Sequence, residues 1–246
     1  MRYLILSDIH ANIDAFETVL EHAEGRWDRA LVLGDMVGYG AEPNAVVDRV
    51  KALGPDTVIR GNHDKAACGI DDGSQFNNVA RMAAVWTARQ LTPANTAYLR
   101  ALPMGPLPIG ALTEICHGAP FDEDHYIFDG HDAHMALAAA KQPVCLFGHT
   151  HLPVIFQTVD EAFEGYPPAG DRETVVPLQR GARYLVNVGS IGQPRDGDPR
   201  AAYGVLDDEA REVRLFRVPY AVEQAQQRIR AAGLPASLAN RLALGR

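Results

Sequence analysis

The sequence predicts an α/β fold: a four-layer αββα sandwich in which two mixed β-sheets pack face to face and are flanked by helices. Its first half alternates short apolar runs with amphipathic helical patterns, which indicates parallel strands with right-handed crossovers. After residue 151 the pattern changes to strands separated by turns, which is typical of antiparallel pairing. A second sheet of this kind must bury one face against the first. Since 246 residues with 47% hydrophobic and 22% charged content are ordinary for a globular protein, we expect one domain over residues 1–246.

The first half of the chain supplies five predicted strands and four predicted helices. The strands are expected at Tyr3–Leu6, Ala30–Leu33, Thr57–Arg60, Leu112–Cys116 and Val144–Phe147. The helices are expected at Ala11–Glu24, Pro43–Leu53, Gln75–Leu91 and Pro93–Leu102. The segment Pro103–Gly110 is rich in proline and glycine and is expected to be a loop.

The second half is predicted to be antiparallel. Val154–Val159 and Thr174–Leu178 are expected to form a two-stranded arm across a turn-rich stretch at residues 165–170. Three further strands and two terminal helices follow, at Tyr184–Val188, Ala202–Leu206, Val213–Val218, Ala221–Ala232 and Pro235–Leu244.

Polar side chains follow each of the five strands predicted in the first half, at the point where the strand ends. In open α/β sheets ligands bind outside the carboxyl ends of the strands, so we expect these side chains to gather at one edge of a sheet. The Asp-x-His and His-x-His spacings suit an extended backbone, in which residues i and i+2 point the same way. The side chains concerned are Asp8, His10, Asp35, Asn62, His63, His117, His149 and His151.

This set of side chains favours a metal centre. It contains imidazoles, carboxylates and one amide but no thiolate, a composition that suits Mn, Zn or Fe better than Ca or Mg. Eight groups are too many for one tetrahedral ion, and a central carboxylate can bridge two ions. We therefore expect two divalent transition-metal ions.

Five ordered motifs carry a family resemblance. They are Asp8-x-His10, Gly34-Asp35-x-x-Gly38, Gly61-Asn62-His63-Asp64, His117-Gly118 and Gly148-His149-x-His151. In that order, over Arg2–Ala202, the sequence resembles the calcineurin-like metallophosphoesterase superfamily. The stretch Asn187–Arg195 is similar to its small bacterial and archaeal phosphodiesterase-like branch.

The resemblance implies a dinuclear site and a reaction. One ion would be held by Asp8, His10, Asp35 and His151, and the other by Asp35, Asn62, His117 and His149. The implied activity is hydrolysis of a phosphodiester or phosphomonoester bond in a small substrate, by in-line attack of a metal-bridging hydroxide. A phosphodiesterase is favoured over a monoesterase, and the alternatives are a nuclease or a metal-binding regulatory module with little turnover.

Three residues are candidates for proton transfer and phosphate binding. His63 lies beside a predicted ligand without being one, and it is the candidate general acid, oriented by Asp35 or Asp64. Arg195 is a candidate phosphate clamp because guanidinium binds phosphate oxygens in pairs, although it could equally be a surface arginine in a Pro/Gly loop. Asn12 is expected to cap the first helix, and the resemblance suggests that it also faces the metal site.

The segment from Ala119 to His134 is unusually rich in Asp and His. A second metal site is one interpretation, but a solvated acidic loop followed by a helix N-terminus is favoured. Because the segment follows His117 directly, it is also a candidate lid. We expect Phe121–Phe128 to touch the leaving-group side of the substrate, with Tyr126 as a stacking residue.

Charge and hydropathy limit the partners and the compartment. The formal net charge of −8 argues against non-specific binding of duplex nucleic acid, which needs a basic surface. A small phosphoester is therefore the expected partner, and a homo-oligomer is left open. No window is long and apolar enough for a membrane span, and a predicted strand begins at the N-terminus where a signal peptide would lie, so we expect a cytoplasmic protein.

Overall fold

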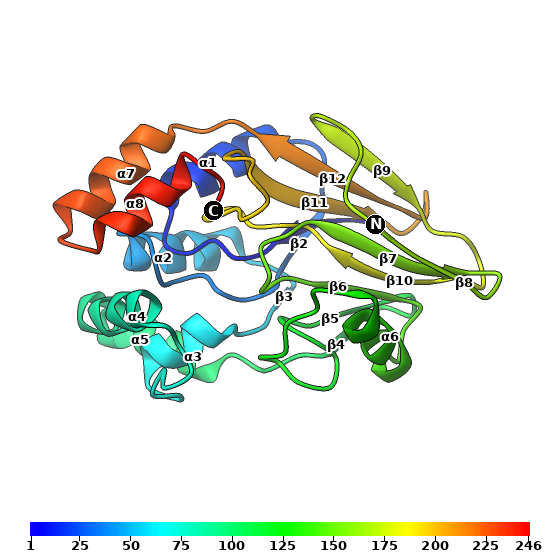
Figure 1. Cartoon of the computed structure of the whole chain (residues 1–246), viewed down its shortest axis with the longest axis horizontal. Helices are drawn as coiled ribbons and strands as arrows, with labels where there is room; N and C mark the ends of the chain where they lie inside the picture. The colour runs from blue at the N-terminus through cyan, green and yellow to red at the C-terminus, as the bar shows by residue number, and fades with distance from the viewer.

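Two six-stranded sheets pack face to face at the centre of the molecule in the computed structural model, which describes residues 1–246 (Figure 1). The first sheet contains, in spatial order, β3 (Thr57–Val58), β2 (Arg29–Val32), β1 (Arg2–Leu6), β11 (Ala201–Asp207), β12 (Glu212–Val218) and β9 (Glu173–Pro177). The second contains β4 (Leu107–Ile109), β5 (Thr113–Ile115), β6 (Val144–Phe147), β10 (Arg183–Asn187), β7 (Val154–Val159) and β8 (Ala162–Tyr166). Each sheet combines parallel and antiparallel pairs, which confirms the predicted fold class.

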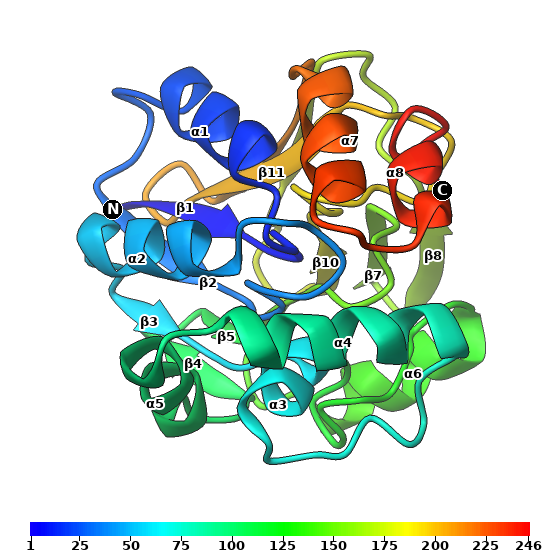
Figure 2. The same cartoon turned by 90° about the vertical axis from the view of Figure 1, so that its left-hand side faces the viewer.

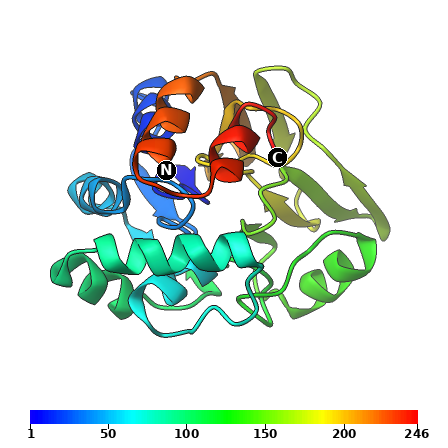
Figure 3. The same cartoon turned by 60° about the vertical axis from the view of Figure 1, so that its left-hand side comes forward.

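Helices complete the outer layers. α1 (Ile13–His22) and α2 (Pro43–Leu53) pack on the outer face of the first sheet, and α6 (Gly130–Ala139) covers the outer face of the second. The short helix α3 (Asn62–Cys68) packs beside α4 (Asn78–Gln90) and α5 (Pro93–Ala101), as Figure 2 shows. At the end of the chain, α7 (Val222–Ala231) and α8 (Ala236–Leu242) lie above α4 in Figure 3 and share an apolar cluster with it.

The alternation of side chains along β1 explains why Leu4, Ile5 and Leu6 are apolar in succession. Ile5 faces the second sheet and belongs to the same buried cluster as Leu146 and Val186. Its neighbours Leu4 and Leu6 face the opposite way and pack with the helices of the outer layer. A strand that is buried on both faces needs apolar residues at every position.

The predicted two-stranded arm is wrong. β7 pairs with β8 in a hairpin, and β9 instead joins the first sheet beside β12. The hairpin turn consists of Asp160 and Glu161, both with positive φ, the backbone that a tight two-residue turn requires. Asp-Glu is not a typical sequence for such a turn. The turn residues at 165–170 therefore predicted pairing with the later strand at Thr174–Leu178.

Three further expectations are corrected by the structure. The five strand ends belong to two sheets, with β1, β2 and β3 in the first and β5 and β6 in the second, and not to a single sheet edge. The segment Pro103–Gly110 contains the short strand β4 where a loop was expected. The strand expected at Thr57–Arg60 ends at Val58.

The motif Gly61–Asp64 begins a helix. The Asp64 carboxylate accepts hydrogen bonds from the backbone N–H of Gly61 at 3.0 Å and of Val37 at 3.2 Å, so it caps α3 and ties it to the loop after β2. Gly69 ends this helix with a φ of 77°. None of the helices is both long and apolar enough to cross a membrane.

Candidate metal centre

The loops that follow four strands of the two sheets bring the predicted ligands together. Asp8 and His10 follow β1, Asp35 follows β2, His117 follows β5, and the last two histidines follow β6. All of these side chains are buried, and Asn62, at the start of α3, is half-buried. The predicted ligands that are buried are Asp8, His10, Asp35, His117, His149 and His151.

Most of these residues adopt a left-handed backbone and not the extended one that their spacing suggested. Asp8 and His10 have φ values of 52° and 49°, Asp35 has 51°, and His149 and His151 have 67° and 60°. Non-glycine residues rarely occupy this region. The i, i+2 explanation for convergence is therefore wrong: tight turns after the strands aim these side chains inward, and the turns are held by bonds such as His10 N–H to the Asp35 carbonyl at 2.9 Å.

The first group of donor atoms comes from Asp8, His10, Asp35 and His151, all within 4.8 Å of one another. The Nε2 atoms of His10 and His151 are 3.0 Å apart. Asp8 Oδ1 lies 3.4 Å from His151 Nε2 and 3.9 Å from His10 Nε2, and Asp35 Oδ2 lies 3.6 Å from His10 Nε2.

The second group comes from Asp35, His117 and His149, again within 4.8 Å of one another. His117 Nε2 lies 3.2 Å from His149 Nδ1, 3.4 Å from Asp35 Oδ2 and 3.3 Å from Asn62 Oδ1. The same oxygen of Asp35 thus faces a histidine of each group. Asp35 lies between the two groups, in the position of a shared ligand.

Backbone carbonyls determine which nitrogen of each ring carries its hydrogen. A carbonyl only accepts, so the ring nitrogen that faces it must donate. Nδ1 donates to Val37 O in His10 (3.1 Å), to Leu33 O in His117 (2.7 Å) and to Gln193 O in His151 (2.6 Å), whereas Nε2 donates to Asp124 O in His149 (3.0 Å). In the neutral rings the remaining nitrogens are all acceptors, and they face one another.

This geometry fits metal ions. Acceptor nitrogens only 3.0–3.2 Å apart repel unless a proton or a cation lies between them. Donor atoms that bind one ion at about 2.0–2.2 Å lie roughly 3.0–3.5 Å from one another, which is close to the observed separations. A histidine whose second nitrogen donates to a carbonyl is also the usual arrangement of a metal ligand.

The two buried carboxylates, Asp8 and Asp35, also favour a cation at this site. Burial alone would lower the pKa of His117, but the Asp35 carboxylate and then Asp8 raise it to about 10. Burial would likewise raise the pKa of Asp35, yet His117 and His63 hold it well below its usual value. Burial lowers the pKa of His10, His149 and His151. The Asp35 and Asp8 carboxylates thus favour positive charge at this site.

His63 lies next to both groups, but the expected carboxylate partners do not hold its ring. Asp35 Oδ1 accepts from the His63 backbone N–H at 2.8 Å, and Asp64 caps the helix. The ring is instead enclosed by Tyr39, with centroids 4.3 Å apart, and stacked on Phe76 at 4.5 Å. Its Nδ1 is buried without a partner against Gly38, where a Cβ would come within 2.5 Å. Nε2 is therefore the nitrogen available to a substrate, and burial lowers the pKa of the ring to about 4.

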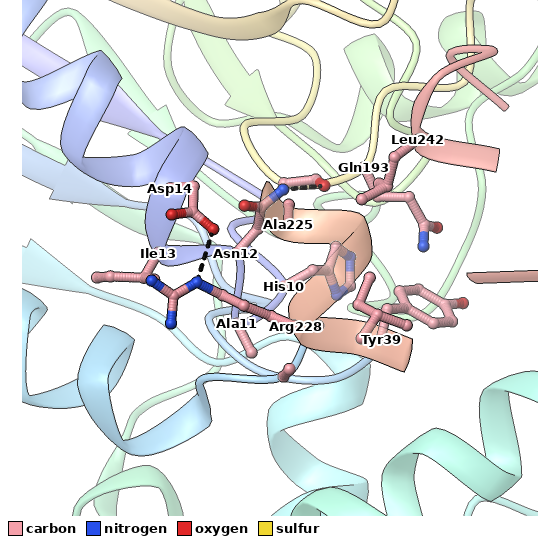
Figure 4. Close-up of a pocket in the computed structure, with 14 residues that line it drawn as sticks. His10, Ala11, Asn12, Ile13, Asp14, Tyr39, Gln193, Ala225, Arg228 and Leu242 are labelled. Atoms are coloured by element: carbon pink, nitrogen blue, oxygen red, sulfur yellow. Dashed lines mark hydrogen bonds and ion pairs between the residues drawn. The ribbon is translucent and has the colours of Figure 1, made fainter. Parts of the chain in front are cut away.

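Asn12 acts as the cap of α1. Its Oδ1 accepts from Ala15 N–H at 3.2 Å, and its Nδ2 donates to Gly192 O at 3.0 Å and to the Tyr220 hydroxyl at 3.2 Å. Figure 4 shows Asn12 and His10 in the wall of a narrow pocket that the ion pair between Asp14 and Arg228 borders. Both polar atoms of Asn12 are engaged, so its expected position facing the metal site stays a prediction.

Arg195 and Tyr126 cover the centre on the solvent side. The guanidinium of Arg195 lies 3.3 Å from the Tyr39 hydroxyl and 5.8 Å above the Tyr39 ring, and its Nε is buried without a partner. The Tyr126 ring stacks on His149 with centroids 3.8 Å apart. Burial raises the pKa of Tyr126 and the nearby charge of Arg195 opposes that rise. The structure thus brings the two residues together at the mouth of the site.

Sequence reasoning missed the residues that support the ligands. The Ser7 hydroxyl donates to Asp8 Oδ2 at 2.6 Å, and Ser190 donates to the Asp8 carbonyl at 2.9 Å. Asn187 donates to the Gly148 carbonyl at 2.7 Å and to Thr150 at 3.0 Å, which holds the turn after β6. Serine and asparagine at such positions have no distinctive spacing, so only their contacts identify them.

Comparisons with known proteins agree with the site and the fold. A family model described as a calcineurin-like phosphoesterase superfamily domain matches residues 1–211. A crystal structure of a metallophosphoesterase from Sphaerobacter thermophilus is 39% identical, has a TM-score of 0.88, and is matched over 100% of this chain and 99% of its own. An uncharacterized protein of Methanocaldococcus jannaschii is 31% identical over 98% of this chain and 97% of its own length. Phosphodiesterase YfcE of Escherichia coli is 24% identical over 87% of this chain and 91% of its own length. The chain belongs to the calcineurin-like phosphoesterase superfamily.

Proposed function

We propose that this protein is a metal-dependent phosphoesterase that uses two divalent ions to hydrolyse a phosphodiester, in preference to a phosphomonoester, of a small substrate. The observation that carries the proposal is the position of Asp35 Oδ2, which faces His10 of one donor group and His117 of the other. A carboxylate so placed can serve two ions at once. The relationship to phosphodiesterase YfcE supports a diester substrate.

Each of the two groups of donor residues would hold one ion. Asp8, His10, Asp35 and His151 would hold one ion, and Asp35, Asn62, His117 and His149 the other. The nitrogen and oxygen donors favour Mn, Zn or Fe. When bound, such a pair of ions polarises phosphoryl oxygens and lowers the pKa of a bound water, which prepares it for in-line attack.

Arg195 is suited to hold the substrate phosphate. Its guanidinium lies beside Tyr39 at the mouth of the site, and its Nε has no protein partner. A planar group with free N–H donors binds two phosphate oxygens together. Arg195 would orient the phosphate relative to the buried ligands and offset its negative charge.

His63 is suited to protonate the leaving oxygen. Its ring is fixed between Tyr39 and Phe76, and its free nitrogen is Nε2. The ring must carry a proton to act as an acid, whereas burial favours its neutral form. An anionic phosphoester beside the ring favours the protonated form, so substrate binding supplies the charge that raises its pKa.

The direct test is hydrolysis of bis-p-nitrophenyl phosphate with added Mn²⁺, beside p-nitrophenyl phosphate, single-stranded DNA and RNA. We expect the diester to be the best substrate. Asp35→Asn should abolish hydrolysis and lose metal from both positions, whereas Asp48→Asn, at an exposed carboxylate of α2, should behave like the wild type. A wild-type protein that binds metal but hydrolyses none of these substrates would instead indicate a binding module. Preferential cleavage of DNA or RNA would indicate a nuclease.

A further inference from the structure

A cluster of ion pairs lies beside the centre and joins α3 to the acidic segment after β5. Lys65 Nζ lies 2.6 Å from Asp124 Oδ2 and 3.0 Å from Glu123 Oε1. Arg60 holds the same Glu123 carboxylate through two bonds, at 2.9 and 3.1 Å. The side chain of Lys65 is only 6% exposed, and burying a charged group to this extent requires paired partners. The expected solvated acidic loop is therefore held in place by ion pairs.

His149 depends on this segment in a way that the other histidines do not. The carbonyls of Leu33, Val37 and Gln193, which bind the other three rings, belong to buried residues. The carbonyl that binds His149 belongs to Asp124, an exposed residue outside any helix or strand.

The His149 ring also carries its hydrogen on the other nitrogen from the three remaining rings. Its Nε2 donates to the carbonyl, and its Nδ1 faces His117. If the Asp124 carbonyl moved away, Nε2 would lose the acceptor that fixes the ring, and the ring could rotate away from the position in which Nδ1 faces the ion.

We propose that Lys65 is a positioning residue for His149: its ion pair with Asp124 keeps the Asp124 carbonyl on Nε2, which leaves Nδ1 free to bind metal. The inference rests on the proposed function for the role of His149 as a ligand. It adds a residue three positions beyond Asn62, so α3 supplies both a ligand and the support for another ligand.

The surroundings of Lys65 allow a selective substitution. In Lys65→Met, Glu123 keeps both bonds to Arg60, and the Asp124 carboxylate, whose side chain is 46% exposed, turns to water. Neither carboxylate is left buried and unpaired. Methionine retains most of the apolar volume of the lysine stem, so α3 should stay folded.

The test measures Mn²⁺ binding to the metal-free protein by calorimetry. Wild type should bind two ions, and Lys65→Met should bind one of them roughly 10–100-fold more weakly, the effect typical of lost outer contacts to a ligand. Lys65→Arg should restore most of the affinity. Asp124→Ala keeps the carbonyl but removes the ion pair, so it should weaken binding of the same ion. The double variant should lose no more affinity for that ion than either single variant. Lys141→Met, at an exposed lysine of the turn after α6, is the matched control.

A second measurement reads the ring directly. In the metal-free protein, NMR should show a His149 Nε2–H, bonded to the Asp124 carbonyl, that exchanges slowly with solvent in wild type and faster in Lys65→Met. A variant that keeps either the wild-type exchange rate or the wild-type affinity for two ions overturns the inference. A wild type that binds no metal would refute the proposed function, while the exchange rate would still decide the role of Lys65.

Discussion

At the scale of single residues, the centre is built from side chains on unfavourable backbone. Five predicted ligands have positive φ, and a left-handed conformation costs about 1–2 kcal/mol for a residue with a Cβ. Such strain is stored where function requires a fixed geometry. Turns that point Asp8, His10 and Asp35 at a common centre explain why the chain keeps a conformation that glycine would adopt more easily.

The proposed role of His63 in proton donation can be tested separately from metal binding. We expect His63→Ala to retain both ions and to lose roughly 10²–10⁴-fold in kcat, the range for a positioned general acid. The loss should be largest for an alkyl or ribose leaving group and small for nitrophenolate, which departs without a proton. Metal counts together with kcat for two diesters of different leaving-group pKa test this.

The two roles of His63 predict different patterns. A ligand would lose metal and show the same defect with both substrates. Equal defects with both ions retained would leave His63 only a charge-stabilising role.

As a proposed ligand, His117 should make metal affinity depend on pH. Asp35 and Asp8 raise its pKa to about 10 against the effect of burial, so in the metal-free protein the ring is protonated at neutral pH. A metal ion must displace that proton. The affinity for metal should therefore increase about tenfold with each unit by which the pH is raised, up to about pH 10. Asp8, whose pKa burial raises to about 6, adds a second displaced proton below pH 6.

Calorimetry in two buffers of different ionisation enthalpy counts these protons. We expect release of about one proton per chain at pH 8 and more at pH 5.5. An affinity that does not change between pH 6.5 and 8.5 would contradict the assignment of His117 as a ligand.

At the scale of elements, the segment between β5 and α6 forms one wall of the site. It folds back on itself through the bond from Gly118 N–H to Glu123 O at 3.1 Å, and Asp129 caps α6 by accepting from the backbone of His131 and Asp132. The rings of Tyr126 and Phe128 are stacked nearly parallel, 5.1 Å apart, and Phe128 is 59% exposed. The stack leads from His149 outward to solvent.

This aromatic stack should affect the choice of leaving group. A stacked planar group contributes about 1–3 kcal/mol, so Tyr126→Ala and Phe128→Ala should lower kcat/KM for nucleoside or aryl esters roughly 5–150-fold relative to alkyl esters. A panel of cyclic nucleotides, dinucleoside polyphosphates and alkyl diesters measures the ratio. Met82→Ala, at an exposed apolar residue of α4, is the control. Unchanged ratios in both aromatic variants would show that the segment does not contact the leaving group.

At the scale of the whole molecule, the centre links the two sheets. Asp8 and Asp35 follow strands of the first sheet, and His117, His149 and His151 follow strands of the second. A bound ion would therefore connect layers that are otherwise held together by the apolar cluster between them. Metal binding should stabilise the fold because the unfolded chain lacks the site.

Removal of metal should lower the melting temperature. A ligand at 100 times its Kd stabilises by about 2.7 kcal/mol, and for a protein of this size 1 kcal/mol corresponds to about 2–4 °C. Two ions should therefore raise Tm by about 10–20 °C over the EDTA-treated protein. Asp35→Asn should show little of this increase, and a wild-type Tm that does not respond to Mn²⁺ would contradict the linking role.

The sequence by itself determined the fold class, and it named the buried Asp and His residues that the structure groups together. Apolar runs that end in Asp, Asn and His are local features, and their order identified both the strands and the superfamily to which the chain belongs. Helix boundaries were also close, because proline and glycine define them locally: α2 spans Pro43–Leu53 as predicted.

The tertiary structure decided what depends on contacts between distant residues. β11 and β12 extend the first sheet beside β1, and β9 pairs with β12 and not with β7, its expected partner. Strand pairing depends on the burial of whole faces and not on neighbours in sequence. In the same way, the packing of His63 between Tyr39 and Phe76 and the pairing of Lys65 with Asp124 join segments that share no sequence pattern. These contacts form only when the two sheets and α3 have packed.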